Sequence, residues 1–347
     1  MKRYTEQVKA GEVQQTSEYQ YVGVWINKKG NLSKHLQFLK EKVYSGVKEL
    51  LNTARESQAG SEAIRVRLKL YESTLRQSLT HSLEVWEGIT DKEIAELEKI
   101  QASALKKILM LPSSTAYVGI LMETGLWPVE QFIWYRKLML YHNIIKSKDS
   151  RLAKLIWLQQ YKFDMPRSFN SNVQTICLSL GLKSNPDHMA LLLKSKWKRQ
   201  VKERIEGYII KKFQPSLQSM TKLRFLRDDR LKRKEYVERS SSHLTQKIMS
   251  IRLNMCPAKE NFRRPNESPL CRLGCEDTEN TEHIICCPVI TNERIKSSDL
   301  VQDDDIELWR RIVNTVEKFG KKVADLEQNV NAEEENQKED ELPVSII

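Results

Sequence analysis

Hydrophobic positions recur every three or four residues over most of the chain, which is the spacing of an amphipathic α-helix. Stripes of this kind predict helices over residues 33–54, 61–86 and 90–109. The third stripe opens with Thr90–Glu93, which has the form of a capping box. Gly and Pro supply only 12 and 10 of the 347 residues. The pattern therefore predicts a mainly α-helical protein with long helices.

One short segment near the N-terminus follows a different pattern. Residues 19–26 alternate aromatic with aliphatic side chains and lead into Asn27 and Gly30. Alternation with a period of two, ending at such residues, is typical of a strand that enters a turn. This segment is the clearest β signal in the sequence.

Helical spacing continues through the second half of the chain, over residues 128–146, 150–161, 171–180 and 187–213 and then on to residue 254. Gly181 is placed to end the third of these helices. Residues 303–305 are three aspartates, and we expect them to cap a last helix that begins at Ile306. Beyond residue 326, seven carboxylates face only Lys338, which predicts a disordered acidic tail.

A chain of this length is expected to form roughly two or three domains. The changes of pattern divide it into a strand-and-turn segment, a helical domain, a basic helical segment, a Cys/His module, a C-terminal helix and an acidic tail. In that order, the predicted segments are 1–31, 32–183, 184–255, 256–298, 299–326 and 327–347.

Composition limits the class of protein further. Charged residues make up 30% of the chain, and no run of 18 apolar residues or signal-peptide core is present. We therefore expect an intracellular protein, cytoplasmic or nuclear, without a membrane partner. Lys and Arg (57) exceed Asp and Glu (46), and the resulting net charge of +11 favours a polyanionic partner.

The positive charge is concentrated in one segment. Residues 194–239 hold sixteen basic and six acidic side chains, a local charge of +10. Such a segment predicts salt-dependent contacts with RNA or DNA phosphates. The aromatic residues among them, Trp197, Tyr208, Phe213, Phe225 and Tyr236, suit stacking on unpaired bases. A solvated helical face whose aromatic residues belong to the core is the alternative. The candidate nucleic-acid-binding residues are Lys194, Lys198, Arg199, Lys202, Lys211, Lys212, Arg224, Arg227, Arg230, Arg233 and Lys234.

Four of the six cysteines lie within 17 positions, beside a histidine. Cys271 and Cys275 form one close pair, and His283 forms a second with either Cys286 or Cys287. Two close pairs joined by a short loop can each supply one edge of a tetrahedral Zn²⁺ site. A Cys₃His set, Cys271, Cys275, His283 and Cys287, would leave no open position, so we predict a structural zinc ion. Unligated thiols are the alternative.

No catalytic constellation emerges from the sequence. Asp228 and Asp229 lie in a basic helical pattern without the apolar strands that hold metal-binding aspartates in polymerases. Ordinary ion pairs on a helix explain them better. The chain has no phosphate-binding loop, nucleophile elbow or dinucleotide-binding motif. No small-molecule substrate is evident, and we expect no catalysis by this chain alone.

Several segments, in this order, resemble the C-terminal portion of the reverse transcriptase polyprotein of non-LTR (LINE-type) retrotransposons. Residues 19–25 resemble the F-x-Y-L-G segment of that family. Residues 69–73, 83–86, 97–101, 105–109 and 123–128 resemble the helices that follow it. The Cys/His cluster resembles the family's C-terminal CCHC module, in which a Cys-Pro pair such as Cys287-Pro288 commonly closes the motif.

This resemblance implies roles for three of the predicted segments. Residues 1–31 would be the remnant of a polymerase palm, with Tyr19, Tyr21, Val22 and Gly23 in a primer-grip-like hairpin. Residues 32–183 would be a thumb-like domain that holds template and primer. Residues 256–298 would be the CCHC zinc module.

Two departures from the family limit the function that the resemblance implies. The catalytic aspartates, which precede the primer grip in the family, have no counterpart here, and nothing after Pro288 matches the endonuclease of some members. We therefore expect a nucleic-acid-binding fragment that cannot polymerise or cut DNA alone. The alternatives are a domesticated helical zinc-containing protein-interaction module, or an RNA-directed DNA polymerase whose palm is missing from the gene model.

Overall fold

The computed structural model describes residues 16–28, 30–56, 63–226, 230–262, 267–291, 295, 297–301 and 305–340. The described part is mainly α-helical, as the hydrophobic spacing predicts, with one two-stranded sheet. None of its helices is long and apolar enough to cross a membrane.

The N-terminal β signal forms a hairpin rather than one strand that enters a turn at Asn27. Strand β1 (Glu18–Tyr21) pairs antiparallel with β2 (Val24–Asn27). Val22 and Gly23 form the tight turn between them, and both have positive φ (47° and 81°). Two consecutive residues with positive φ make the kind of turn that matches the twist of a two-residue hairpin. All of β1 is exposed, whereas Val24 of β2 is buried.

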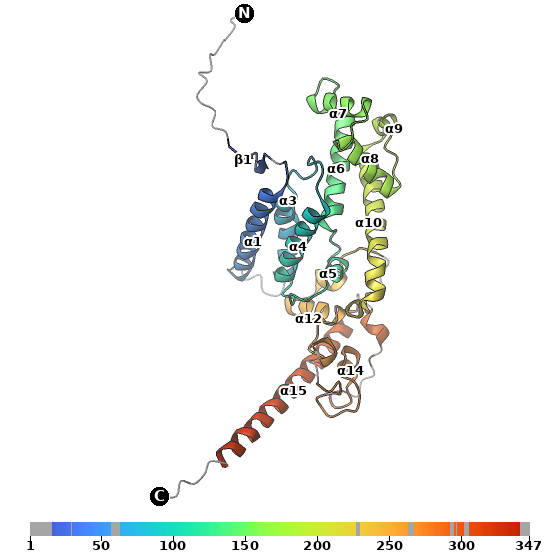
Figure 1. Cartoon of the computed structure of the whole chain (residues 1–347). Helices are drawn as coiled ribbons and strands as arrows, with labels where there is room; N and C mark the ends of the chain where they lie inside the picture. The colour runs from blue at the N-terminus through green and yellow to red at the C-terminus, as the bar shows by residue number, and fades with distance from the viewer. Residues whose placement is uncertain are drawn as a thin grey trace, which may run out of the picture.

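The first helices form a bundle at one side of the molecule (Figure 1). They are α1 (Ser33–Glu56), α2 (Ala63–Leu70), the π-helical turn η2 (Tyr71–Leu75), α3 (Arg76–Leu79) and α4 (Asp91–Ile108). The predicted capping box of α4 is confirmed, with the Thr90 side chain and Glu93 each bonded to the other's backbone N–H. The predicted helix over 61–86 is wrong over residues 80–86, because regular helix ends at Leu79.

The next helices extend the fold as a pair of long neighbours, α6 and α10 (Figure 1). The elements of this region are α5 (Tyr117–Thr124), α6 (Val129–Ile145), α7 (Leu152–Lys162), α8 (Phe169–Leu180), α9 (Pro186–Leu191) and α10 (Lys194–Ser219). Gly181 ends α8 in the left-handed conformation (φ 62°), as predicted.

The single helix predicted over residues 187–213 is in fact two helices, α9 and α10. The chain is extended at Leu192 and Leu193 between them. The Leu192 carbonyl lies 3.0 Å from His142 Nε2 of α6, and the Leu192 side chain is buried. This tertiary contact uses a carbonyl that a continuous helix would bond to its own backbone, so the helix is interrupted.

The C-terminal third contains shorter elements and one long helix. They are η3 (Thr221–Leu223), α11 (Glu235–Arg239), α12 (Ser242–Arg252), α13 (Lys259–Phe262), α14 (Thr281–Cys286), η4 (Ser297–Leu300) and α15 (Ile306–Asp340). Asp305 caps α15 as expected, since its Oδ1 accepts the Leu308 N–H at 2.9 Å.

The prediction of a disordered tail from residue 327 is wrong for residues 327–340, which continue α15. This stretch contains no Gly or Pro and is rich in Glu, Gln, Lys and Ala, which are good helix formers. Residues 341–347 lie outside the described part of the chain.

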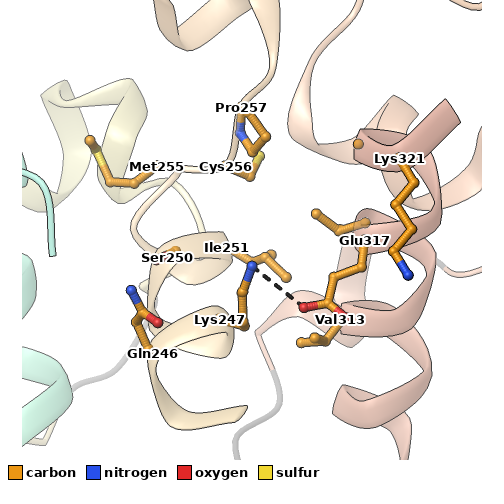
Figure 2. A pocket seen from close by; sticks show the side chains of 12 residues that line it. Gln246, Lys247, Ser250, Ile251, Met255, Cys256, Pro257, Val313, Glu317 and Lys321 are labelled. Atoms are coloured by element: carbon orange, nitrogen blue, oxygen red, sulfur yellow. Dashed lines mark ion pairs between the residues drawn. The ribbon is translucent and has the colours of Figure 1, made fainter. Parts of the chain in front are cut away.

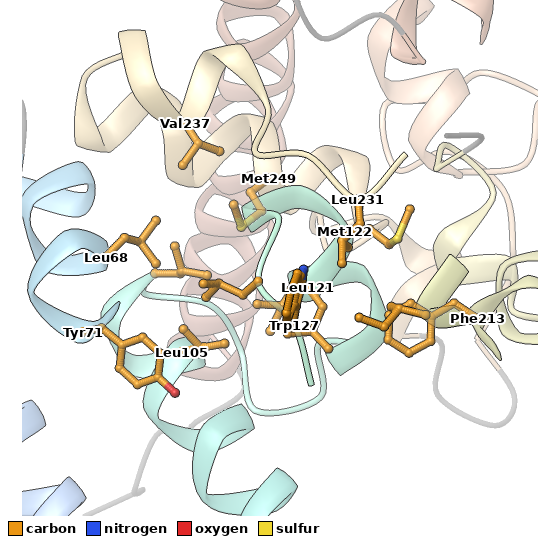
Figure 3. Close-up of a cluster of buried hydrophobic side chains, with 14 of the residues drawn as sticks. Leu68, Tyr71, Leu105, Leu121, Met122, Trp127, Phe213, Leu231, Val237 and Met249 are labelled. Atoms are coloured by element: carbon orange, nitrogen blue, oxygen red, sulfur yellow. The ribbon is translucent and has the colours of Figure 1, made fainter. Parts of the chain in front are cut away.

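One connected core runs through the described helices, from Leu32 to Val323. Figure 3 shows a place where helices from distant parts of the chain contribute buried side chains to it. The side chains there include Leu68 of α2, Leu105 of α4, Leu121 of α5, Phe213 of α10, Val237 of α11 and Met249 of α12. The core therefore links the N-terminal bundle to the basic segment and to α12.

Candidate metal centre and basic surface

Cys271 and Cys275 lie on a tight turn that closes a short antiparallel pairing. Leu270 is bridged to Thr278, and the Cys271 N–H donates to the Asp277 carbonyl at 2.9 Å. Gly274 takes a positive φ of 84° in the turn, which a glycine adopts without strain. The turn brings both cysteines to the same end of the pairing.

His283 and Cys287 come from the next element, the short helix α14. Asn280 caps this helix, its Oδ1 accepting the His283 N–H at 2.7 Å. Cys287 follows the last helical residue, so it lies one turn after His283. The second predicted pair is therefore held on one side of a helix.

The four predicted ligands meet in space. One candidate ligand atom from each of Cys271, Cys275, His283 and Cys287 lies within 4.8 Å of the other three, so the cluster could hold a metal ion. Cys275 Sγ and Cys287 Sγ are 3.5 Å apart. Two thiolates at about 2.3 Å from one tetrahedral Zn²⁺ would lie only slightly farther apart.

The histidine is oriented as a metal ligand would be. His283 Nδ1 lies 3.5 Å from a carboxylate oxygen of Asp277. Nε2 is buried and has no hydrogen-bond partner among the described residues. Metal-ligating histidines commonly have one ring nitrogen on the metal and the other on a carboxylate. An unpartnered buried nitrogen beside three thiols thus fits a metal site.

The cysteines have the environment of buried thiols. Burial raises the pKa of Cys271, and it raises the pKa of Cys287 to about 12. The Leu273 N–H donates to Cys271 Sγ at 3.4 Å, a contact that stabilises a thiolate. A bound cation would supply the charge that keeps these thiols deprotonated.

The two neighbouring cysteines of the second pair differ in position. Cys286 is exposed, and its thiol donates to the Glu282 carbonyl at 3.0 Å, one turn earlier in α14. Cys287 is buried in the cluster. Of the two choices that the spacing left open, Cys287 is the one placed with the other ligands.

A buried carboxylate that sequence reasoning missed supports the Cys/His module. Glu279 is fully buried and accepts the Arg272 guanidinium at 2.7 Å, the Arg272 N–H at 2.9 Å and the Lys259 N–H at 3.1 Å. Although burial alone would raise the pKa of Glu279, these hydrogen bonds hold it below its usual value. In the sequence, Glu279 is one of four carboxylates in a loop, and nothing distinguishes it from the others.

The candidate nucleic-acid-binding residues fall into two groups. The first lies on α10, whose inner face is formed by the buried residues Trp197, Val201, Ile205, Ile209 and Phe213. Its outer face is exposed and basic. The predicted residues there are Lys194, Lys198, Arg199, Lys202 and Lys211, together with Lys196 and Arg204.

The second group is largely engaged in intramolecular contacts. Lys212 pairs with Glu130 at 2.9 Å. Arg224 pairs with Glu260 at 3.0 Å and with Glu282 at 2.5 Å. Arg233 pairs with Glu72 at 2.6 Å and with Glu238 at 2.7 Å. Lys234 is buried. Arg230 is exposed, and Arg227, like Asp228 and Asp229, lies outside the described residues.

A close backbone approach explains why Arg233 and Lys234 are not on the open surface, whereas Lys232 is exposed. Gly125 ends α5 with a φ of 66°, and a Cβ there would lie 2.4 Å from the Arg233 backbone nitrogen. Lys234 N–H also donates to the Glu123 carbonyl at 3.1 Å. The segment therefore runs directly against the end of α5.

The aromatic residues of the basic segment are mostly core residues. Trp197, Phe213, Phe225 and Tyr236 are buried, so the interpretation of these four as base-stacking groups is wrong. Tyr208 differs from them, since it is half-buried and its ring lies 5.2 Å from that of Trp134.

The four residues that the resemblance assigns to a primer grip lie together in the hairpin. Tyr19, Tyr21 and Val22 are exposed, and Gly23 forms the turn with Val22. The Val22 carbonyl lies 3.2 Å from His81 Nε2, which attaches the turn to the bundle. Figure 1 places this hairpin and α14 at different ends of the molecule, so the hairpin and the Cys/His cluster are separate sites.

A hollow of about 480 Å³ lies between α12 and α15. Figure 2 shows that its walls are formed by apolar side chains such as Ile251, Met255 and Val313. Glu317 pairs there with Lys247 at 3.4 Å and with His243 at 3.3 Å. Lys321 also lines the hollow, so two lysines and one carboxylate lie in its walls.

Comparison with models of protein families, with curated proteins and with solved structures finds no match to this chain.

Proposed function

We propose that this chain is a nucleic-acid-binding protein that holds single-stranded RNA or DNA along the outer face of α10. The observation that carries the proposal is the set of exposed cations between Lys194 and Lys211, on the flanks and outer side of a helix whose other face is buried. At 1.5 Å per residue this stretch of helix is about 26 Å long, which matches about seven or eight stacked nucleotides. The buried face fixes the helix in place, so little backbone conformational freedom is lost on binding.

Salt-dependent binding of short oligonucleotides tests this function. We expect the purified chain to bind 20-nucleotide RNA and DNA strands with an affinity that falls steeply as salt rises, because phosphate contacts release counterions. Lys198→Glu with Lys202→Glu should weaken binding and reduce the salt dependence. Lys40→Glu with Lys48→Glu, on exposed positions of α1, is the matched control. Binding that does not respond to salt would contradict the proposal.

We further propose that the Cys/His cluster holds a structural zinc ion. Three thiolates and one imidazole are the donor set that Zn²⁺ prefers, and four protein ligands leave no position for a substrate. The unpartnered Nε2 of His283 and the clustered sulfur atoms support this assignment. One zinc ion per purified chain, measured by atomic emission, is the expected result.

We also propose that the chain derives from a non-LTR retrotransposon reverse transcriptase. The order of the resembling segments supports this origin. Genomic sequence around the coding region tests it, and an adjoining open frame that encodes a Y-x-D-D strand pair would also favour an active polymerase.

One observation favours a second candidate, a protein-interaction module. Helix α7 exposes Leu152 (72%), Leu155 (50%) and Ile156 (47%), whereas Lys154 is buried and donates to the Ile145 carbonyl at 2.7 Å. An apolar face flanked by the exposed cations Lys148 and Arg151 suits an acidic amphipathic helix of a partner. A synthetic Leu/Glu helical peptide should bind the chain, and Leu155→Gln with Ile156→Gln should abolish that binding. Equal binding by this variant would rule the candidate out.

A further inference from the structure

A groove lies between the end of α8 and the middle of α10. It consists of two hollows, of about 530 and 440 Å³, which share Glu203 and Arg204 in their walls. Gly207, Tyr208 and Lys211 line the larger hollow, and Gly181 and Lys183 line the smaller one. We call this continuous surface the α8–α10 groove. Each hollow has the size of pockets that hold a ligand as large as a nucleotide.

The charge of the groove is positive and largely uncompensated. Lys183, Arg204 and Lys211 have no ion pair with any residue that the structure describes. Lys212, at the rim, is paired with Glu130. Glu203 is the acidic residue of the groove, and it lies 3.9 Å from Arg199 on the outer face of α10. The groove therefore differs from the α12–α15 hollow, where Glu317 is paired with Lys247.

Gly207 has no explanation in the packing of the chain itself. Glycine is, apart from proline, the poorest helix former, yet Gly207 lies inside α10. Apart from its chain neighbours and the backbone of its own helix, no atom lies within 4 Å of the place where its Cβ would be. By contrast, a Cβ at Gly46 of α1 would meet Leu75 Cδ2 at 2.3 Å, so packing requires that glycine. The missing side chain at Gly207 instead keeps the wall of the groove open beside Tyr208.

Tyr208 supplies a fixed aromatic surface next to this opening. Its ring is half-buried and lies against Trp134, with the centroids 5.2 Å apart. An aromatic ring held by the core and partly exposed can stack on an unpaired base without losing side-chain freedom. Arg204 and Lys211 lie about one turn to either side of it along α10.

From these observations we infer that the α8–α10 groove binds one segment of a nucleic-acid single strand. One base packs over Gly207 against Tyr208, and the adjoining phosphates contact Arg204, Lys211 and Lys183. A duplex is too wide for hollows of this size, whereas RNA and single-stranded DNA share the chemistry that fits. The inference rests on the proposed function and names the place where the bound strand leaves the outer face of α10.

Filling the opening tests the inference on the full chain. In Gly207→Leu the new side chain should occupy the space of the base and weaken binding of a fluorescent 12-nucleotide oligo(U) or oligo(dT) by about tenfold or more. Gly320→Leu is the matched control, because Gly320 of α15 also has nothing within 4 Å of its Cβ position. Both substitutions favour the helix, and circular dichroism checks that the chains are folded.

Charge variants provide a second measurement that does not depend on filling the groove. Arg204→Gln and Lys211→Gln should each weaken binding and lower the salt dependence by about 0.7 in log–log slope, whereas Lys48→Gln should change neither. Oligo(U) and oligo(dT) should compete with each other, and hairpin duplexes should compete poorly.

The outcomes separate this inference from the proposed function. If the wild-type chain binds neither oligonucleotide in a salt-sensitive way, the proposed function itself fails. If it binds them and Gly207→Leu binds equally well, the strand does not enter the groove and the inference is overturned. A poly-glutamate peptide of equal length provides a third test. If it displaces the oligonucleotide from the wild-type chain but not from Arg204→Gln, the groove binds an acidic protein instead.

Discussion

The guanidinium of Arg252 lies 2.8 Å from the carboxylate of Glu123, and both side chains are almost completely buried. The two residues are 129 positions apart in the sequence, on α12 and α5. Tyr236 of α11 donates a short hydrogen bond to the same carboxylate, and the Arg252 guanidinium also donates to the Leu300 carbonyl at 3.0 Å. This pair therefore links α5 to α12 and to the segment that leads into α15.

Removal of one partner of this pair should strongly destabilise the protein. Glu123→Ala leaves the Arg252 charge buried without its carboxylate, and we expect a loss of about 3–5 kcal/mol in the free energy of unfolding. Replacement of both residues, Glu123→Leu with Arg252→Met, should cost less than the sum of the single changes. Urea unfolding followed by circular dichroism gives these values.

An exposed ion pair provides the control. Glu307 and Arg310 are 3.0 Å apart on α15 and mostly exposed, so Glu307→Ala should leave the stability almost unchanged. A cost for Glu123→Ala as small as that of Glu307→Ala would contradict the role assigned to the buried pair.

Much of the helical architecture can be predicted from the sequence because helix signals are local. The capping box at Thr90, the C-cap at Gly181 and the apolar stripes of α1 and α4 are visible in the order of residues. The break between α9 and α10 is not, because it depends on His142 of another helix. The prediction from composition was also wrong over residues 327–340. Their acidic content indicated disorder, although their helix propensity is high.

The candidate sites show the same division between local and tertiary information. The spacing of Cys271, Cys275 and His283 identified the Cys/His cluster, since a tight turn and one helix bring the residues together. The charge of Arg233 was equally visible, but its partner Glu72 is 161 positions away. The density of positive charge in the sequence therefore overestimated the area of exposed basic surface. The same density gave no indication of the α8–α10 groove.

Loss of the metal should unfold the Cys/His module. We expect Cys271→Ser to lower the zinc content from about one ion per chain to nearly none, because three remaining ligands bind Zn²⁺ far more weakly. Hydrogen exchange over residues 267–291 should then become fast, since folding of such small modules depends on metal binding. A strong chelator should have the same effect on the wild-type chain.

Cys286 is the matched control for this experiment. Its exposed thiol lies outside the cluster, so Cys286→Ser should keep the full zinc content and the protection of residues 267–291. Equal zinc loss in both variants would mean that Cys286 is a ligand and that the assignment of Cys287 is incorrect.

The two groups of basic residues should respond differently to substitution. Lys198→Gln and Lys202→Gln remove exposed charges on α10, so we expect weaker oligonucleotide binding and unchanged thermal stability. Arg233→Gln breaks ion pairs with Glu72 and Glu238 and should lower stability by roughly 1–3 kcal/mol while the salt dependence of binding stays the same. Parallel thermal unfolding and fluorescence anisotropy distinguish these effects. A reduced salt slope in Arg233→Gln would place that residue in the nucleic-acid interface.

Two glycines in helices should give opposite results when changed to alanine. In Gly46→Ala the new Cβ would overlap Leu75 Cδ2, and displacement of that buried side chain should cost about 1–3 kcal/mol, more than the gain in helix propensity. In Gly207→Ala nothing lies within 4 Å, so the change should stabilise the protein by roughly 0.5–1 kcal/mol. Chemical denaturation of the two variants measures the change in the free energy of unfolding, which should be negative for Gly46→Ala and positive for Gly207→Ala. Stabilisation by Gly46→Ala would show that α1 and η2 are not packed as closely as described.

The buried histidine of α1 should make the protein sensitive to acid. His35 is almost fully buried, with its ring beside those of Phe38 and Trp86 at 6.2 and 6.4 Å. Burial lowers the pKa of His35, and the nearby charges of His81 and Lys42 act in the same direction. Below pH about 6.5 the unfolded chain therefore binds a proton at this residue that the folded chain does not. The contribution to stability is fully present above that pH and is lost as the pH falls further, by up to about 1.4 kcal/mol per unit.

His35→Leu should reduce the slope of stability against pH between 6.5 and 5, whereas His243→Gln, at an exposed position, should not remove this component. If His35→Leu and the wild-type chain lose stability equally over that range, protonation of His35 is not the cause of acid sensitivity.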